Sequence, residues 1–98
     1  MKLPHVLTEK ATRDIVEASL WEEARSLGLG RKLLSRIEEA IEQISRLPFG
    51  YVSRHHNTRE KKVKTFSYQI IYTVEENVIY IHAVFPCKQD PEKKYKNM

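Results

Sequence analysis

Apolar residues recur at every second position between residues 68 and 85, and this alternation is the clearest pattern in the chain. The first run is Tyr68, Ile70, Tyr72 and Val74, and the second is Ile79, Ile81, Ala83 and Phe85. A period of two places each run on one face of a β-sheet, where β-branched and aromatic side chains are favoured. The polar triplet at residues 75–77 suits a hairpin loop. Residues 62–85 therefore predict two antiparallel strands, with a third strand leading into them.

Two amphipathic helices are predicted before these strands. Thr8 suits an N-cap and Glu9 the first turn of a helix that runs to about Ser26. This helix carries two apolar stripes, Ala11, Ile15, Ala18 and Trp21 in one and Val16, Leu20, Ala24 and Leu27 in the other. The second helix spans about residues 31–46, with apolar residues spaced i, i+3, i+4, i+7. The double stripe predicts that the first helix contacts the sheet and also a second helix or a partner protein.

The remaining segments complete an α+β fold. Residues 3–7 suit an edge strand, residues 51–55 a further strand, and residues 57–60 a turn. The order β-α-α-β-β-β-β predicts a helical hairpin packed on one face of a mostly antiparallel twisted sheet. We expect residues 1–98 to form a single domain with a polar tail from about residue 87.

Charge and composition narrow the function. The chain has 98 residues, of which 41% are hydrophobic, and a net charge of +4, which favours an anionic partner. Its basic residues concentrate at 54–64 and 88–96, on either side of the predicted sheet strands, and predict a cationic open face of the sheet. No apolar run approaches the roughly 20 residues of a membrane span, and the first residues lack a signal-peptide pattern. We therefore expect a cytoplasmic protein without a membrane partner.

Metal and cofactor chemistry is not predicted. His55 and His56 are adjacent and would point to opposite faces of a strand, and no cysteine or carboxylate cluster has ligand spacing with them. Cys87 is the single cysteine, so no internal disulfide is expected.

Several short motifs, in this order and at this spacing, resemble the RelE/ParE toxin superfamily of bacterial type II toxin–antitoxin systems. They are residues 11–15 at the start of the first helix, Trp21, the Gly28-Leu29-Gly30 break, residues 66–72, residues 81–85 and Asp90-Pro91. The resemblance covers about residues 3–91 and is nearest to the ParE-like, or plasmid-stabilisation, branch. Many relatives have histidine and then arginine where this chain has residues 86–89, Pro-Cys-Lys-Gln.

The resemblance implies a toxin that is neutralised by a cognate acidic antitoxin, as a hetero-oligomer or with the toxin as a homodimer. The ParE-like branch inhibits DNA gyrase by binding. The RelE-like branch cuts mRNA on the ribosome, which requires proton transfer and fixed cations at the phosphate. The changes at residues 86–89 favour the binding branch, because an ammonium does not replace a guanidinium at a phosphate. A homologue that has lost toxicity is a third alternative.

Candidate site residues follow from these two activities. For an mRNA endoribonuclease, the catalytic candidates are Arg59, Lys62, Lys64, Lys88 and Tyr95. For antitoxin or target binding, the candidates are Arg54, Lys62, Lys64, Trp21 and Leu20. Lys62 and Lys64 are two positions apart, so on a strand they would project from the same face. The same lysines also suit a solvated strand that resists edge-to-edge association.

Overall fold

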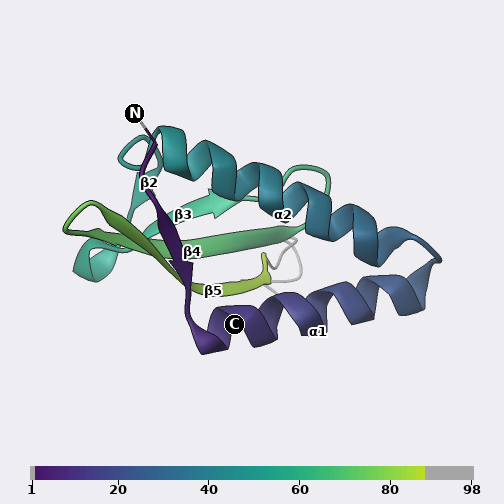
Figure 1. The fold of residues 1–98 in the computed structure, drawn as a ribbon. Helices are drawn as coiled ribbons and strands as arrows, with labels where there is room; N and C mark the ends of the chain where they lie inside the picture. Colours follow the sequence, from purple (N-terminus) through teal and green to yellow (C-terminus); the bar gives the residue numbers. More distant parts are fainter. Residues whose placement is uncertain (1, 88–98) are drawn as a thin grey trace, which may run out of the picture.

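The predicted α+β fold is confirmed. A computed structural model of the chain describes residues 2–87, apart from the side chain of His55. Helix α1 is Glu9–Arg25 and helix α2 is Leu29–Arg46, and the two run antiparallel and meet at the turn on the right of Figure 1. The predicted polar tail lies almost entirely outside the described residues, so it and the single domain over residues 1–98 stay predictions.

Five strands form one mixed sheet. They are β1 (His5–Leu7), β2 (Val52–Ser53), β3 (Arg59–Lys62), β4 (Tyr68–Glu75) and β5 (Val78–Pro86), and a short 3₁₀ turn at His55–Asn57 joins β2 to β3. Their order across the sheet is β1-β5-β4-β3-β2. β1 pairs with β5 in parallel, and the other pairs are antiparallel. The first strand of the chain therefore lies beside the last, at one edge of the sheet (Figure 1).

Local chemistry explains where the helices begin. The Thr8 hydroxyl accepts a hydrogen bond from the Ala11 N–H at 3.1 Å and caps α1 as predicted. Gly28 precedes α2 with a φ of 90°, a conformation that glycine adopts without steric cost. A Cβ on Gly30 would lie 2.6 Å from the Ser19 carbonyl oxygen, so glycine allows the two helices to approach closely.

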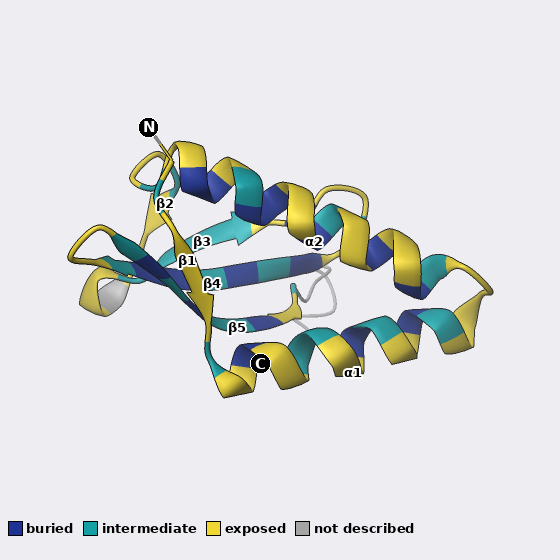
Figure 2. Cartoon of the chain, viewed as in Figure 1, coloured by how far each residue is buried: buried dark blue, intermediate teal, exposed yellow. Residues whose placement is uncertain are grey.

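The core lies between the helical hairpin and one face of the sheet. Its largest fully buried side chains are Tyr72, Leu33, Ile44, Ile70, Ile79 and Ile81. Figure 2 shows the buried residues of α2 and β4 on facing surfaces, with exposed residues on the outer sides of both helices. The predicted alternation in β4 and the predicted spacing in α2 both correspond to this burial.

The predicted alternation in the last strand is wrong beyond Ile81, because a β-bulge interrupts it. Ile71 pairs with Ala83 and Tyr72 pairs with Ile81, so His82 is an extra residue in β5. The insertion reverses which residues face the core, and Val84 is buried while Phe85 is exposed. The periodicity of the sequence does not reveal this, because Val84 and Phe85 are both apolar.

Two boundaries in the basic segment also differ from the predictions. Arg59 and Glu60, predicted to lie in a turn, belong to β3, and the second strand of the sheet is only Val52–Ser53. β3 ends at Lys62, so Lys64 lies in the loop before β4 and not on the strand. The prediction that Lys62 and Lys64 project together from one strand face is therefore wrong.

Candidate functional site

A groove separates α1 from the ends of β4 and β5. It is about 400 Å³ in volume, is lined mainly by apolar side chains, and includes Trp21, Tyr68 and Pro86 in its wall. A second hollow of about 480 Å³ shares these three residues and extends to Cys87. We call this pair of connected hollows the Trp21 groove.

The outer side of α1 exposes apolar side chains beside this groove. Leu20 is 65% exposed, Trp21 is 63% exposed, and Val16 is 51% exposed. The predicted stripe of Val16 and Leu20 thus has no partner among the described residues. Trp21 belongs to the other predicted stripe, where Glu22 is buried in its place. Large apolar side chains that gather on a helix surface are typical of a protein interface.

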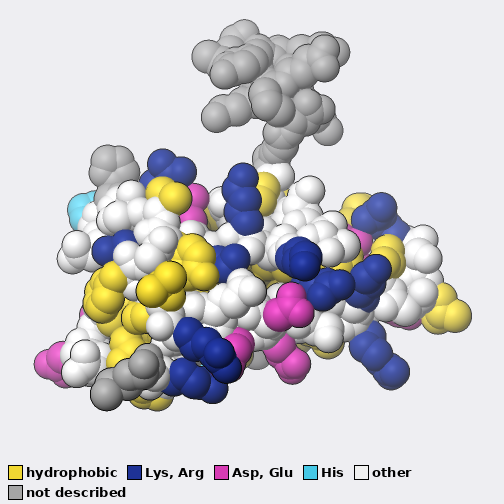
Figure 3. Space-filling view, turned by 90° about the horizontal axis from the view of Figure 1, so that it is seen from above, with side chains coloured by type: hydrophobic (Ala, Val, Ile, Leu, Met, Phe, Trp, Pro, Cys, Tyr) yellow, Lys and Arg dark blue, Asp and Glu magenta, His cyan; other side chains and the backbone are white. Residues whose placement is uncertain are grey.

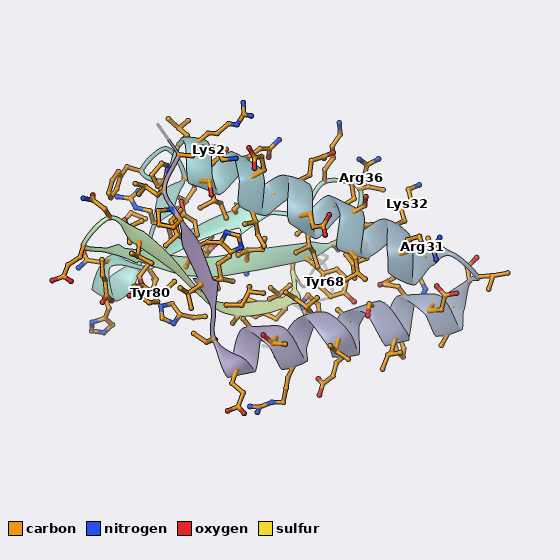
Figure 4. The ribbon with its side chains drawn as sticks, in the orientation of Figure 1. Lys2, Arg31, Lys32, Arg36, Tyr68 and Tyr80 are labelled. Atoms are coloured by element: carbon orange, nitrogen blue, oxygen red, sulfur yellow. The ribbon has the colours of Figure 1, made fainter. Side chains whose placement is uncertain are left out.

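Glu22 is buried in a polar network behind the groove. Its carboxylate accepts a hydrogen bond from the Tyr68 hydroxyl at 3.1 Å and pairs with the Arg25 guanidinium at 2.7 Å. Burial, followed by the hydrogen bond to Glu22, raises the pKa of Tyr68. Figure 4 shows Tyr68 between the sheet and α1. A buried carboxylate needs such partners, so the network fixes this part of α1 against β4.

Asp14 attaches the other end of α1 to β5. Its Oδ2 accepts a hydrogen bond from the Val84 backbone N–H at 3.0 Å and another from Lys10 Nζ at 2.9 Å. Across the adjacent bulge, Thr73 Oγ1 lies 2.8 Å from His82 Nε2. Mid-strand His82 is therefore a packed, hydrogen-bonded residue.

The sequence did not single out Glu22, Asp14 or Tyr68 as residues of the groove. One signal was present, because Ala11, Ala18 and Glu22 follow the i, i+7, i+11 spacing of a single helix face. The hydrophobicity of Trp21 favours that residue over Glu22, so the predicted apolar stripe lies one position too early at this point.

The basic candidates are not brought together. Arg54 pairs with Glu60, with Nε 3.1 Å from Oε2. Arg59 donates from Nη1 to the carbonyl oxygens of Tyr51 at 2.9 Å and Phe49 at 3.3 Å. Arg59 is therefore held by the loop that follows α2.

The register separates the strand cations further. Arg59 lies opposite the buried Tyr72, whereas Lys62 lies opposite Gln69 on the other face of the sheet. The prediction of a cationic open face is therefore wrong for Arg59. Lys62 and Lys64 are exposed. Lys88 and Tyr95 lie outside the described residues, so their predicted roles stay untested.

Residues 2–87 contain neither a metal-binding cluster nor a membrane-spanning helix. No group of three or more histidine, cysteine or carboxylate side chains there is arranged to hold a metal ion. None of the helices in this range has the length and hydropathy to cross a membrane.

A hairpin of helices over one face of a mixed sheet, with an exposed apolar helix surface beside a groove, defines a small α+β domain with a surface suited to protein binding. The chain belongs to the ParE toxin family. The model of this family, described as the ParE toxin of the type II toxin–antitoxin system parDE, matches residues 6–91. The protein is thus a ParE/RelE-family toxin of a type II toxin–antitoxin system.

Solved structures share the fold. A chain of the chromosomal ParDE toxin–antitoxin system from P. aeruginosa has a TM-score of 0.73 at 15% identity, covering 89% of this chain and 98% of that chain. A mutant of the E. coli toxin RelE in the free state has a TM-score of 0.66 at 13% identity, covering 98% and 93%. The RelBE2 toxin–antitoxin complex from Mycobacterium tuberculosis gives 0.59 at 20% identity, covering 88% and 99%. No curated protein matches the chain.

Proposed function

We propose that this toxin acts as the ParE-like branch does, by binding and inhibiting its target, and that the target is DNA gyrase. The supporting observation is the separation of the residues suggested for RNA cleavage. Such cleavage needs cations and proton-transfer groups that converge on one phosphate. Arg59 instead holds two backbone carbonyls on the helix side of the sheet, and Lys62 belongs to the opposite face.

A DNA supercoiling assay tests the proposal. Purified toxin added to gyrase and relaxed plasmid is expected to reduce supercoiling in proportion to its concentration, and the purified antitoxin should restore it. Full supercoiling at a large excess of folded toxin would exclude gyrase as the target.

An mRNA endoribonuclease is the second candidate, because Lys62 and Lys64 are exposed and free to meet a phosphate. A translation extract that contains a defined mRNA tests it. Cleavage by the wild type that disappears in Lys64→Ala and in Lys88→Ala would establish this activity and displace the binding mechanism. If the mRNA stays intact and the growth of cells that express the toxin alone is unaffected, the chain is a homologue without toxicity.

We also infer that the antitoxin docks on the exposed face of α1 and in the Trp21 groove. The predicted partner residues Leu20 and Trp21 lie on this face, and the groove adds apolar wall beside them. An amphipathic helix of the antitoxin would place its apolar residues there, in the manner of helix-in-groove recognition. The acidity of the antitoxin, a toxin homodimer and action in the cytoplasm remain predictions.

The product of the neighbouring reading frame is the antitoxin to test. In calorimetric titrations, we expect Leu20→Gln combined with Trp21→Ala to weaken binding at least tenfold, since buried aromatic and aliphatic anchors dominate such interfaces. The matched control is Val52→Thr on β2, because Val52 is also exposed but lies at the far edge of the sheet. Equal affinities for wild type and the α1 variant would contradict docking on α1.

A further inference from the structure

A group of cations covers the outer side of the first half of α2. It consists of Arg31, Lys32 and Arg36, which we call the α2 basic patch. Figure 4 shows the three side chains projecting from α2 on the side away from the sheet. In Figure 3, which looks down on α2, lysine and arginine side chains gather over the helix.

Two of the three charges of this patch are not neutralised locally. Within residues 2–87, neither Arg31 nor Lys32 has an acidic oxygen within 4.0 Å of its charged nitrogens. Arg36 Nη1 lies 3.3 Å from Glu39 Oε2, while its Nε is buried without a hydrogen-bond partner.

Glu23, an acidic residue near the start of the patch, is hydrogen-bonded to backbone N–H groups. The Glu23 carboxylate accepts the N–H of Gly28 at 3.0 Å and of Gly30 at 2.9 Å. These backbone hydrogen bonds, with a smaller contribution from Arg31, lower the pKa of Glu23. The first turn of α2 contains no acidic residue. The patch therefore presents an excess of positive charge to solvent.

The three cations spread along and around the outer side of α2. At about 1.5 Å of rise and about 100° per residue, Arg31 and Arg36 are about 7.5 Å apart along the helix axis and about 140° apart around it, with Lys32 between them. Guanidinium groups bind phosphate oxygens in a bidentate manner, and lysine adds a point charge.

The surroundings favour a nucleic acid over an acidic protein segment. At 100° per residue, Ser35 and Glu39 lie between the three cations on the same face, while Leu33 and Ile37 are buried in the core. A protein partner needs an apolar centre for its interface. Exposed apolar side chains gather on α1, whereas beside the patch α2 exposes Leu34 alone, at 39%. An unstacked single strand would need aromatic side chains for its bases, and α2 has none.

We propose that the α2 basic patch binds the phosphate backbone of double-stranded DNA, independently of base sequence. It forms a second surface of the toxin, separate from the Trp21 groove, and it does not depend on the inhibition of gyrase. Arg31 and Arg36 contact phosphate oxygens through their guanidinium groups, and Lys32 adds a point charge.

The test is fluorescence anisotropy of a labelled 20-base-pair DNA duplex, titrated with toxin at several salt concentrations. We expect the triple variant R31Q/K32Q/R36Q to bind at least tenfold more weakly than wild type in 50 mM salt. The slope of log affinity against log salt should become shallower by about 2 to 3, at about 0.9 per lost phosphate contact. Circular dichroism checks that the variant keeps its fold.

The matched control removes the same charge elsewhere. Lys10, Arg13 and Arg46 are exposed and each is paired with an acidic residue of its own helix. The variant K10Q/R13Q/R46Q should bind DNA within threefold of wild type. If both triple variants weaken binding equally, net charge alone explains it and the patch is not a site.

Two further probes test the identity of the ligand. Polyglutamate of equal total charge should bind more weakly than the duplex and should not distinguish the patch variant from its control. If it binds as tightly and with the same dependence on the patch, the partner is an acidic protein and the proposal is overturned. Preferential binding of a duplex RNA of equal length would overturn the assignment to DNA.

Discussion

Single buried hydroxyls contribute to the attachment of α1 to the sheet. The Tyr68 hydroxyl donates to the buried Glu22 carboxylate. Tyr68→Phe leaves this carboxylate with one hydrogen bond fewer, and we expect it to lower the free energy of unfolding by about 1–3 kcal/mol in urea titrations.

The matched control for this substitution is Tyr80→Phe. Tyr80 lies on β5, and within the described residues its hydroxyl makes no hydrogen bond. Its loss should change the free energy of unfolding by less than about 0.5 kcal/mol. Equal effects of the two substitutions would contradict a stabilising role for the bond between Tyr68 and Glu22.

Tyr72 predicts how stability depends on alkaline pH. Its ring is fully buried, its hydroxyl donates to the Pro48 carbonyl at 2.6 Å, and burial raises its pKa to about 12. Between pH 10 and about pH 12, the unfolded chain therefore loses this proton while the folded protein keeps it, so stability falls as pH rises. Urea midpoints measured from pH 8 to 11.5 should decline less steeply in Tyr72→Phe than in wild type. Parallel declines would exclude Tyr72 as a source of this dependence.

At the scale of elements, the helical hairpin depends on one small residue. An added methyl group on Gly30 would meet the Ser19 carbonyl at 2.6 Å, so α1 and α2 would have to move apart. We expect Gly30→Ala to cost about 1–3 kcal/mol in the free energy of unfolding, despite the higher helix propensity of alanine.

Ser35→Ala is the control for this effect. Ser35 is exposed on the same helix, so the substitution should be neutral or slightly stabilising in the same urea titration. A stabilising effect of Gly30→Ala would show that the helices tolerate the wider spacing.

The sequence predicts the elements well where one pattern dominates. In α2 the buried residues follow an uninterrupted helical period, and its end was predicted at the correct residue. In β5 the prediction fails after Ile81, because an inserted residue is recognisable only from its pairing with β4. In α1 the apolar Trp21 precedes Glu22, yet Glu22 is the buried residue, because Tyr68 and Arg25 satisfy its charge.

At the scale of the whole molecule, the ion pairs stabilise the fold only slightly. Several of them join two exposed side chains, such as Lys2 with Glu42 and Arg46 with Glu42. Exposed pairs contribute about 0–1 kcal/mol each and are screened by salt. We expect the free energy of unfolding to change by less than about 1 kcal/mol between 0.05 and 0.5 M NaCl. A larger loss in salt would indicate that charge pairing, and not the apolar core, holds the hairpin on the sheet.

The sequence also predicts the architecture of the molecule but not its charged surface. The register of β3 turns Arg59 to one side of the sheet and Lys62 to the other. Helix α2, whose sequence pattern indicates only an amphipathic helix, carries the α2 basic patch. Basic residues that are close in the sequence therefore separate in space, because neighbouring strand positions point to opposite faces.

The extra residue in β5 shifts the inward and outward alternation of that strand by one position. Before His82 the odd-numbered residues Ile79 and Ile81 face the core, and after it the even-numbered Val84 faces the core. If His82 took part in a regular alternation, Val84 would face outward and Phe85 inward, whereas deletion of His82 would leave Val84 on the core face. A homologue that lacks this residue would therefore keep the same core residues with a regular strand, and a homologue that has it needs the bulge.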